Sequence, residues 1–239
     1  MTVSEGRVGL DARRLARAVV LTAWTGFFVW LLVTGEVSRY LGPRTLWVVP
    51  VGAVALALAA VAQLISVRSA RTPPLSTREV FGLGALLLPL VAVAVVPTPA
   101  LGSLAASKKA SGAIALGSLA APAPEPGREI SFIDIFYASR SQKYADAVGV
   151  SDVTPVELLG FVTTPSEAPR GTFEITRFYV SCCAADAVPY SATVVGSDLS
   201  PQRDTWVQVA GTLSRRDDRY VVVADRVTER SEPEDPYLY

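Results

Sequence analysis

The residues with the greatest capacity for chemistry are Cys182 and Cys183, which are adjacent and are the only cysteines in the 239-residue chain. Asp186 follows three positions after the second cysteine. Because the chain contains no histidine, a soft metal ion or a thiol reaction would have to use this segment. Two thiolates and a carboxylate suit zinc or copper(I), but a structural zinc site usually takes four Cys or His ligands. The segment therefore indicates an incomplete metal site that would borrow ligands from a partner.

Two other interpretations of the cysteines stay open. Free cysteine is often buried, and the apolar run over residues 173–182 predicts a strand. Alternation along that strand would place Phe178, Val180 and Cys182 on the core face, with Cys183 opposite. Cys182 would then be a small core residue. A redox function is the third interpretation, because adjacent cysteines close only a strained, labile disulfide, although the thioredoxin-type C-x-x-C spacing is absent.

Three uncharged apolar runs in the first half of the chain predict transmembrane helices. Each run is close to the roughly 20 residues that cross a bilayer, and a helix satisfies its own backbone hydrogen bonds in lipid. The predicted helices lie near residues 18–35, 46–67 and 80–97, in a membrane domain of residues 18–97. Because these runs carry no charge, they indicate no ion path of their own.

The basic residues predict how the helices are oriented. Four arginines lie in the arm formed by residues 1–17, and three lie between the second and third predicted helices. The segment between the first and second helices has only two. Since basic flanking segments stay in the cytoplasm, we expect the arm inside the cell and everything after the third helix outside. The predicted location is the plasma membrane, with several crossings.

The second half of the chain predicts an extracytoplasmic, mainly β domain over residues 128–239, preceded by a linker of Ala, Gly, Ser and Pro over residues 98–127. Strand-like segments are 130–137, 157–163, 173–182, 192–195, 206–213 and 220–227, with a short helix over 141–148. Gly160 and Gly211 fall inside strands, where a small barrel bends sharply. The pattern favours an OB-like small barrel; an SH3-like barrel and a small sandwich are the alternatives.

Composition argues against two classes of function. Residues 128–239 carry eleven Lys and Arg against seventeen Asp and Glu, whereas nucleic-acid affinity depends on basic contacts to phosphate. The chain has no histidine, no nucleophile motif and no phosphate-binding glycine loop. We therefore expect neither nucleic-acid binding nor an enzyme.

Residues 177–189 resemble the bacterial YcgQ-like membrane proteins, whose signature is Arg-Phe…Cys-Cys-x-Ala-Asp-x-x-Pro. Supporting similarities are Gly160-Phe161-Val162, Trp206-Val207, Val209-x-Gly211, the ending at residues 233–239, and Gly35, Tyr40 and Pro43-Arg44 in the first outer loop. Members of this family contain a domain of unknown function and typically pair with a YcgR-like permease. The resemblance implies a membrane accessory subunit with a permease partner, and it implies no substrate.

Together these observations predict a non-enzymatic subunit that is anchored in the lipid bilayer and presents Cys182, Cys183 and Asp186 at the mouth of a permease. The segment would serve soft-metal binding, with zinc or copper, or partner binding. The alternative from another class is a stand-alone cell-surface metallochaperone or thiol-redox protein.

Overall fold

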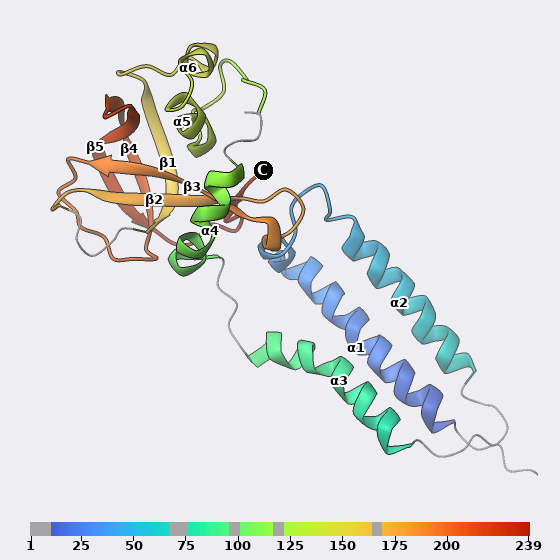
Figure 1. The fold of residues 1–239 in the computed structure, drawn as a ribbon. Coiled ribbons are helices and arrows are strands. Elements are labelled where there is room, and N and C mark those ends of the chain that lie inside the picture. Colours follow the sequence, from blue (N-terminus) through green and yellow to red (C-terminus); the bar gives the residue numbers. More distant parts are fainter. Residues whose placement is uncertain (1–10, 67–75, 96–100, 117–121, 164–168) are drawn as a thin grey trace, which may run out of the picture. The chain divides into compact units, whose positions relative to one another are not determined.

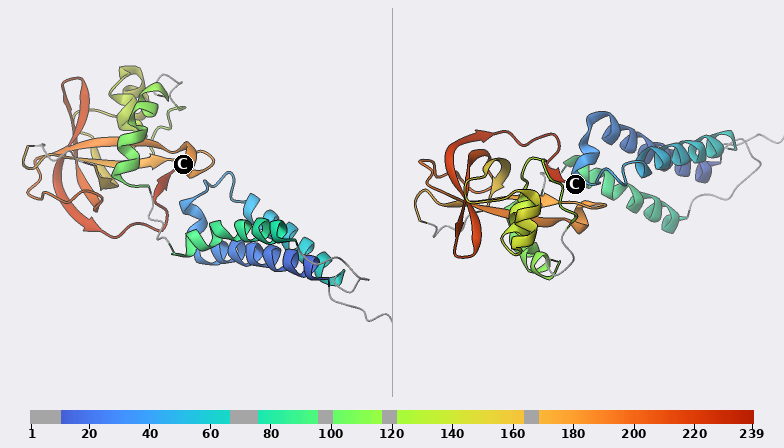
Figure 2. Two further views of the ribbon diagram at one scale, coloured as in Figure 1. Left: turned by 60° about the horizontal axis from the view of Figure 1, so that its bottom comes forward. Right: turned by 90° about the horizontal axis from the view of Figure 1, so that it is seen from above.

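The structure is a computed structural model, and it describes residues 11–66, 76–95, 101–116, 122–163 and 169–239 (Figure 1). The chain forms two compact units, which Figure 2 shows from two further sides. The helical unit runs to Ser38 and continues over Arg44–Thr98. The barrel unit consists of Pro99–Tyr239 together with the short segment Arg39–Pro43. This segment comes from the connection between the first two long helices.

The helical unit contains α1 (Ala12–Thr34), α2 (Val48–Ile65) and α3 (Thr77–Val95). They occupy the three predicted runs. Helix α1 begins before the predicted start because Asp11 accepts hydrogen bonds from the backbone amides of Arg13 and Arg14 and so caps the helix. Among the described helices, α1 and α2 are long and apolar enough to cross a membrane.

Polar contacts fix the direction of the three helices within their unit. Arg13 forms an ion pair with Glu79 at 2.9 Å, and Arg14 Nη1 donates to the Ser66 carbonyl oxygen at 2.6 Å. The start of α1, the end of α2 and the start of α3 therefore lie at one end of the unit. Helix α2 is therefore antiparallel to both α1 and α3.

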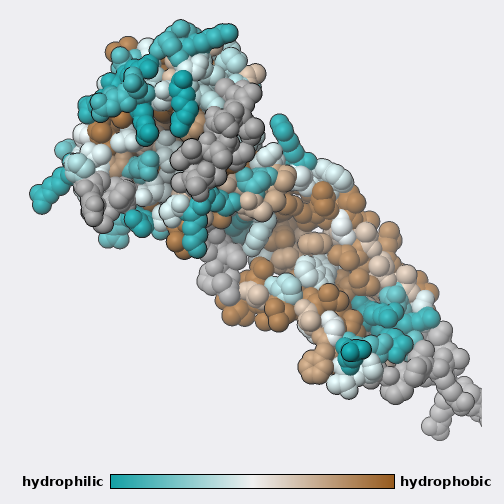
Figure 3. All heavy atoms as spheres, viewed as in Figure 1, coloured by the Kyte–Doolittle hydropathy of each residue, from teal (hydrophilic) through white to brown (hydrophobic). Residues whose placement is uncertain are grey.

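Large apolar side chains are exposed on all three helices. Examples are Val33, Leu58, Ile65, Phe81 and Leu88. In Figure 3 the helices appear mostly brown, whereas teal dominates the visible surface of the barrel unit. An exposed apolar surface of this extent marks contact with lipid or with another protein.

The described residues of the barrel unit form five main strands and a short sixth. They are β1 (Pro155–Val162), β2 (Phe173–Tyr179), β3 (Val188–Val195), β4 (Trp206–Arg216), β5 (Arg219–Arg230) and β6 (Tyr237–Leu238). Strand β1 pairs with both β4 and β2, which closes the sheet, and β3 pairs with β5 in parallel. This is a closed five-stranded Greek-key barrel of the OB type, as predicted.

Two glycines bend the strands where the sequence predicted. A Cβ on Gly160 would lie 2.9 Å from both the Phe132 ring and the Thr176 carbonyl oxygen. A Cβ on Gly211 would collide with the Val223 carbonyl oxygen, at the point where the β4–β5 register shifts by a bulge. Both positions need glycine because another part of the barrel occupies the space of a side chain.

Of two predictions about the segment before the barrel, one is wrong and one is confirmed. Residues 130–137 were expected to be a strand, but α5 (Phe132–Ala138) is a helix, because Ser131 and Asp134 form a capping box. The short helix predicted over 141–148 is confirmed as α6 (Gln142–Val148).

The predicted linker contains a further helix, α4 (Ser103–Leu116). The backbone amide and hydroxyl of Ser103 donate to the Asp204 carboxylate at 2.6 and 2.9 Å, and Ala106 is buried in an apolar cluster with Phe161 and Trp206. Helix α4 is therefore a packed part of the barrel unit.

Candidate functional site

The cysteines lie in a turn that follows β2, which we call the thiol segment (residues 180–186). Strand β2 ends at Tyr179, so the strand predicted as far as Cys182 is too long. Cys182 is exposed and Cys183 is half-buried, whereas Val180 is 1% exposed. The expectation that Cys182 is a core residue is wrong.

Asp186 determines the shape of the thiol segment. The backbone amides of Ser181, Cys182 and Cys183 donate to its two carboxylate oxygens at 3.0, 2.8 and 3.3 Å. These amides lie beyond the last residue of β2, and the carboxylate satisfies their hydrogen bonds where the chain leaves the strand. The aspartate that the sequence offered as a metal ligand is thus already bonded to the backbone.

The same carboxylate changes the acidity of its neighbours. Partial burial, the largest influence on Asp186, opposes its ionisation, but hydrogen bonds from the Cys182 thiol and from three backbone amides outweigh burial and lower the pKa. Hydrogen bonding to Asp186, followed by that to Cys183, raises the pKa of Cys182 to about 11. The Cys182 thiol therefore keeps its proton at neutral pH.

The two thiols have a spacing that suits a metal ion. Their Sγ atoms are 3.8 Å apart, and all three possible ligand atoms of Cys182, Cys183 and Asp186 lie within 4.8 Å of one another. With Zn–S bonds of about 2.3 Å, two sulfurs of a tetrahedral site are about 3.8 Å apart. The sulfur pair therefore fits two corners of a tetrahedron. The chain supplies no histidine for the others.

A segment from between the first two long helices pairs with the thiol segment. Gly42 N donates to the Cys182 carbonyl oxygen at 3.1 Å, and Ala184 N donates to the Tyr40 carbonyl oxygen at 2.8 Å. Leu41 and Cys183 form an antiparallel bridge. Both segments belong to the barrel unit, so the backbone around the thiols is held from both sides.

Further contacts hold this arrangement in place. Tyr237 Oη donates to the Arg39 carbonyl oxygen at 3.1 Å, and Arg39 pairs with Glu232 at 3.3 Å. A cation from α4, Lys109, donates to the carbonyl oxygens of Ala185 and Ala184 at 2.8 and 3.3 Å.

The structure places Cys182, Cys183 and Asp186 close together, and their use as metal ligands stays a prediction. The sequence did not predict the contacts of Lys109 and of residues 40–42. No sequence pattern indicated the contacts of Lys109, since it lies in a low-complexity stretch. For residues 40–42 the first-loop similarity at Tyr40 and Pro43 was the available signal.

Comparison with known proteins agrees with this description of the barrel. Residues 140–239 match the family model described as the DUF1980 C-terminal domain. The matched part contains all six strands and the thiol segment. No curated protein matches the chain.

Proposed function

We propose that this protein is a non-enzymatic accessory subunit of a membrane permease, with three transmembrane helices and an extracytoplasmic barrel. The barrel offers Cys182 and Cys183 to a soft metal ion, zinc or copper(I), as cargo. The resemblance to YcgQ-like proteins and the match to a DUF1980 domain support a subunit of this kind, and the YcgR-like permease partner rests on the resemblance.

The observation that carries the proposal is the pairing of residues 40–42 with the thiol segment. If α1 and α2 both cross the membrane, the connection between them lies on the side opposite the N-terminal arm. Arg39–Pro43 is part of the barrel unit, which supports a barrel on that same side.

This requirement bears on α3. In the proposed arrangement the chain returns after α2 to the side of the arm, and a third crossing then leads to the barrel. Among the described residues between Ser66 and Leu101, α3 is the helix that could make this crossing. Its 19 residues are close to the roughly 20 that span a bilayer. The antiparallel arrangement of α2 with α1 and α3 supports three crossings.

The geometry of the thiols favours transfer of a metal over permanent structural binding. Two sulfurs are placed at a tetrahedral spacing, while the Asp186 oxygens are occupied by backbone amides. A two-sulfur site leaves other coordination positions open for ligands from the partner. A raised thiol pKa also means that binding releases protons, so affinity should increase with pH.

Purification of the tagged full-length protein in mild detergent tests both parts of the proposal. We expect a multi-span permease to co-purify, and we expect about one zinc or copper ion per chain after metal loading, with the Cys182→Ser, Cys183→Ser double variant losing the metal. The full chain is required, because a fragment beginning at residue 128 would lack both α4 and residues 40–42.

The matched control is Ser197→Ala, which removes a half-buried hydroxyl of the barrel that lies outside the thiol segment and bonds the backbone of Leu199; it should keep both the metal and the partner. Metal without any permease would favour the stand-alone metal-binding protein. If the permease co-purifies with both proteins and the double variant holds as much metal as the wild type, the role of the thiols is contradicted.

A further inference from the structure

A cleft of about 830 Å³ opens on the barrel unit, and its lining residues lie outside the thiol segment. Its walls come from α4, α5, the outer face of β2 and β3, and the turn between β4 and β5. Neither cysteine nor Asp186 lines it. Its volume falls in the range of small-molecule binding sites, roughly 300–1,000 Å³.

The floor of the cleft is a row of connected hydroxyl groups. Thr163 Oγ1 lies 2.8 Å from Thr176 Oγ1, which lies 2.7 Å from Ser191 Oγ. Thr176 and Ser191 are direct partners in the β2–β3 ladder, and Glu174 faces Thr193 one step along the same side. Strand alternation thus places hydroxyls and a carboxylate on one polar face.

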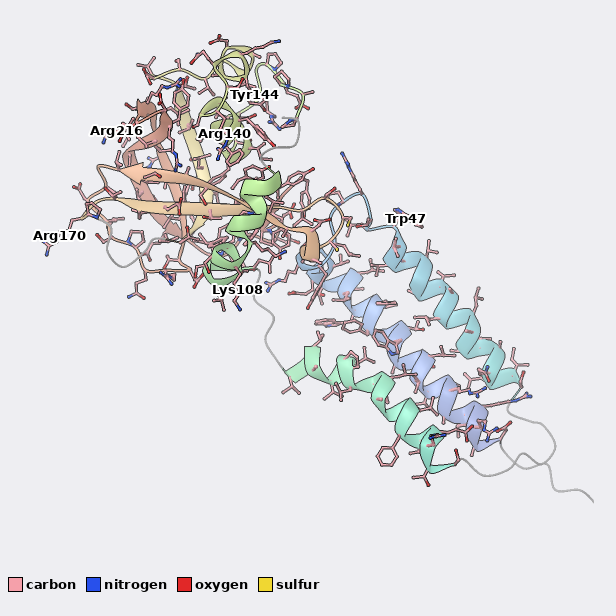
Figure 4. All side chains as sticks on the ribbon, viewed as in Figure 1. Trp47, Lys108, Arg140, Tyr144, Arg170 and Arg216 are labelled. Atoms are coloured by element: carbon pink, nitrogen blue, oxygen red, sulfur yellow. The ribbon has the colours of Figure 1, made fainter. Side chains whose placement is uncertain are left out.

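The rim of the cleft carries more positive than negative charge. Arg140, at the end of α5, and Arg216, at the end of β4, are labelled in Figure 4, and Arg219 begins β5. Against these three cations stand Glu174 and Asp217. The Arg140 guanidinium carbon lies 3.6 Å from the centre of the Phe136 ring, which holds this cation at the edge of the cleft.

The pKa shifts of Arg140 and Glu174 both include an influence of the Arg219 charge, so these groups lie close together. Burial, and next the charge of Arg219, lower the pKa of Arg140. Burial raises the pKa of Glu174, while a hydrogen bond from Thr163 and the charge of Arg219 oppose that change. Arg219 therefore lies near enough to influence both groups.

We propose that this cleft binds a small acidic saccharide, a ligand of one or two sugar units that carries a carboxylate. Sugar hydroxyls both donate and accept, which matches the half-buried hydroxyls of Thr163 and Ser191 beside the Glu174 carboxylate, with the fully buried Thr176 hydroxyl linking the two. The planar guanidinium groups of Arg140 and Arg219 suit a carboxylate, and the net positive rim favours an acidic sugar over a neutral one. The site depends neither on the thiols nor on a permease partner.

Binding measured by calorimetry on the full-length protein in detergent tests the proposal, with glucuronate, glucose and inorganic phosphate as probes. We expect saturable binding of glucuronate, weaker binding of glucose and no binding of phosphate alone. Arg140→Gln and Arg219→Gln should each weaken glucuronate binding about tenfold, because each removes a charge-assisted hydrogen bond. Ser191→Ala should weaken glucuronate and glucose alike.

Arg226→Gln is the matched control, since Arg226 is exposed on β5 and does not line the cleft; it should leave binding unchanged. Equal thermal unfolding of the variants excludes a folding defect. Three outcomes would overturn the proposal: no saturable binding of glucuronate at millimolar concentration, phosphate binding as tightly as glucuronate, or tighter binding of a single-stranded oligonucleotide that is lost in the same arginine variants.

Discussion

Replacing Gly211 with alanine should lower the free energy of unfolding of the barrel unit by about 3 kcal/mol or more. A Cβ at this position would collide with the carbonyl oxygen of Val223, and that oxygen belongs to a strand paired along almost the whole length of β4. Neither backbone can move away without breaking the ladder beside the bulge. The barrel is therefore expected to lose much of its marginal stability.

Denaturant unfolding, followed by the fluorescence of Trp206, measures this loss. Trp206 is buried in the barrel unit and starts the same strand. Thr212→Ala is the matched control on β4, where the side chain is half-buried; it should cost about 1 kcal/mol. Equal midpoints for Gly211→Ala and wild type would show that the closure of the barrel at this bulge is wrong.

Replacing Asp186 with asparagine should raise the alkylation rate of Cys182 at pH 8 on the order of tenfold. The Asp186 carboxylate is the largest of the influences that raise the pKa of Cys182 to about 11. Without it, the thiol should titrate closer to the ordinary cysteine value of about 8.5. More thiolate is then present at pH 8, although each thiolate is a weaker nucleophile.

The comparison is made in a Cys183→Ser background, so that iodoacetamide reports on one thiol. With Asp186 present the rate should rise about tenfold per pH unit from pH 8 to pH 10, since the thiolate fraction grows below the pKa. With asparagine it should level off near pH 9. Asp198→Asn changes an exposed carboxylate elsewhere on the barrel and should have no effect. A rate that levels off below pH 9 while Asp186 is present would contradict the hydrogen-bonded arrangement.

Much of the fold follows from local sequence patterns. The three apolar runs predict three helices, and alternation in β4 together with the position of Gly211 predicts a bent strand in a small barrel. These features depend on neighbouring residues, which is why the sequence could predict them. The helix α5 was missed although its Ser131 and Asp134 cap was visible, because its aromatic and β-branched residues favour a strand.

The thiol segment was predicted only in part, because its conformation depends on contacts between distant residues. Cys182 was expected on a core face as long as the strand continued, but Asp186 binds the backbone amides and ends the strand at Tyr179. The contacts of Tyr40 and Gly42 join segments about 140 residues apart. No pattern of spacing within residues 177–189 could indicate them.

The side of the membrane on which the barrel lies tests the central claim most directly. Two reporters are placed in a Cys182→Ser, Cys183→Ser background: Asp198→Cys on the barrel and Arg71→Cys between the second and third predicted helices. A membrane-impermeant maleimide should label the first in intact cells and the second only after permeabilisation. Labelling of the Asp198→Cys reporter only after permeabilisation would contradict an extracytoplasmic barrel held beside the first loop.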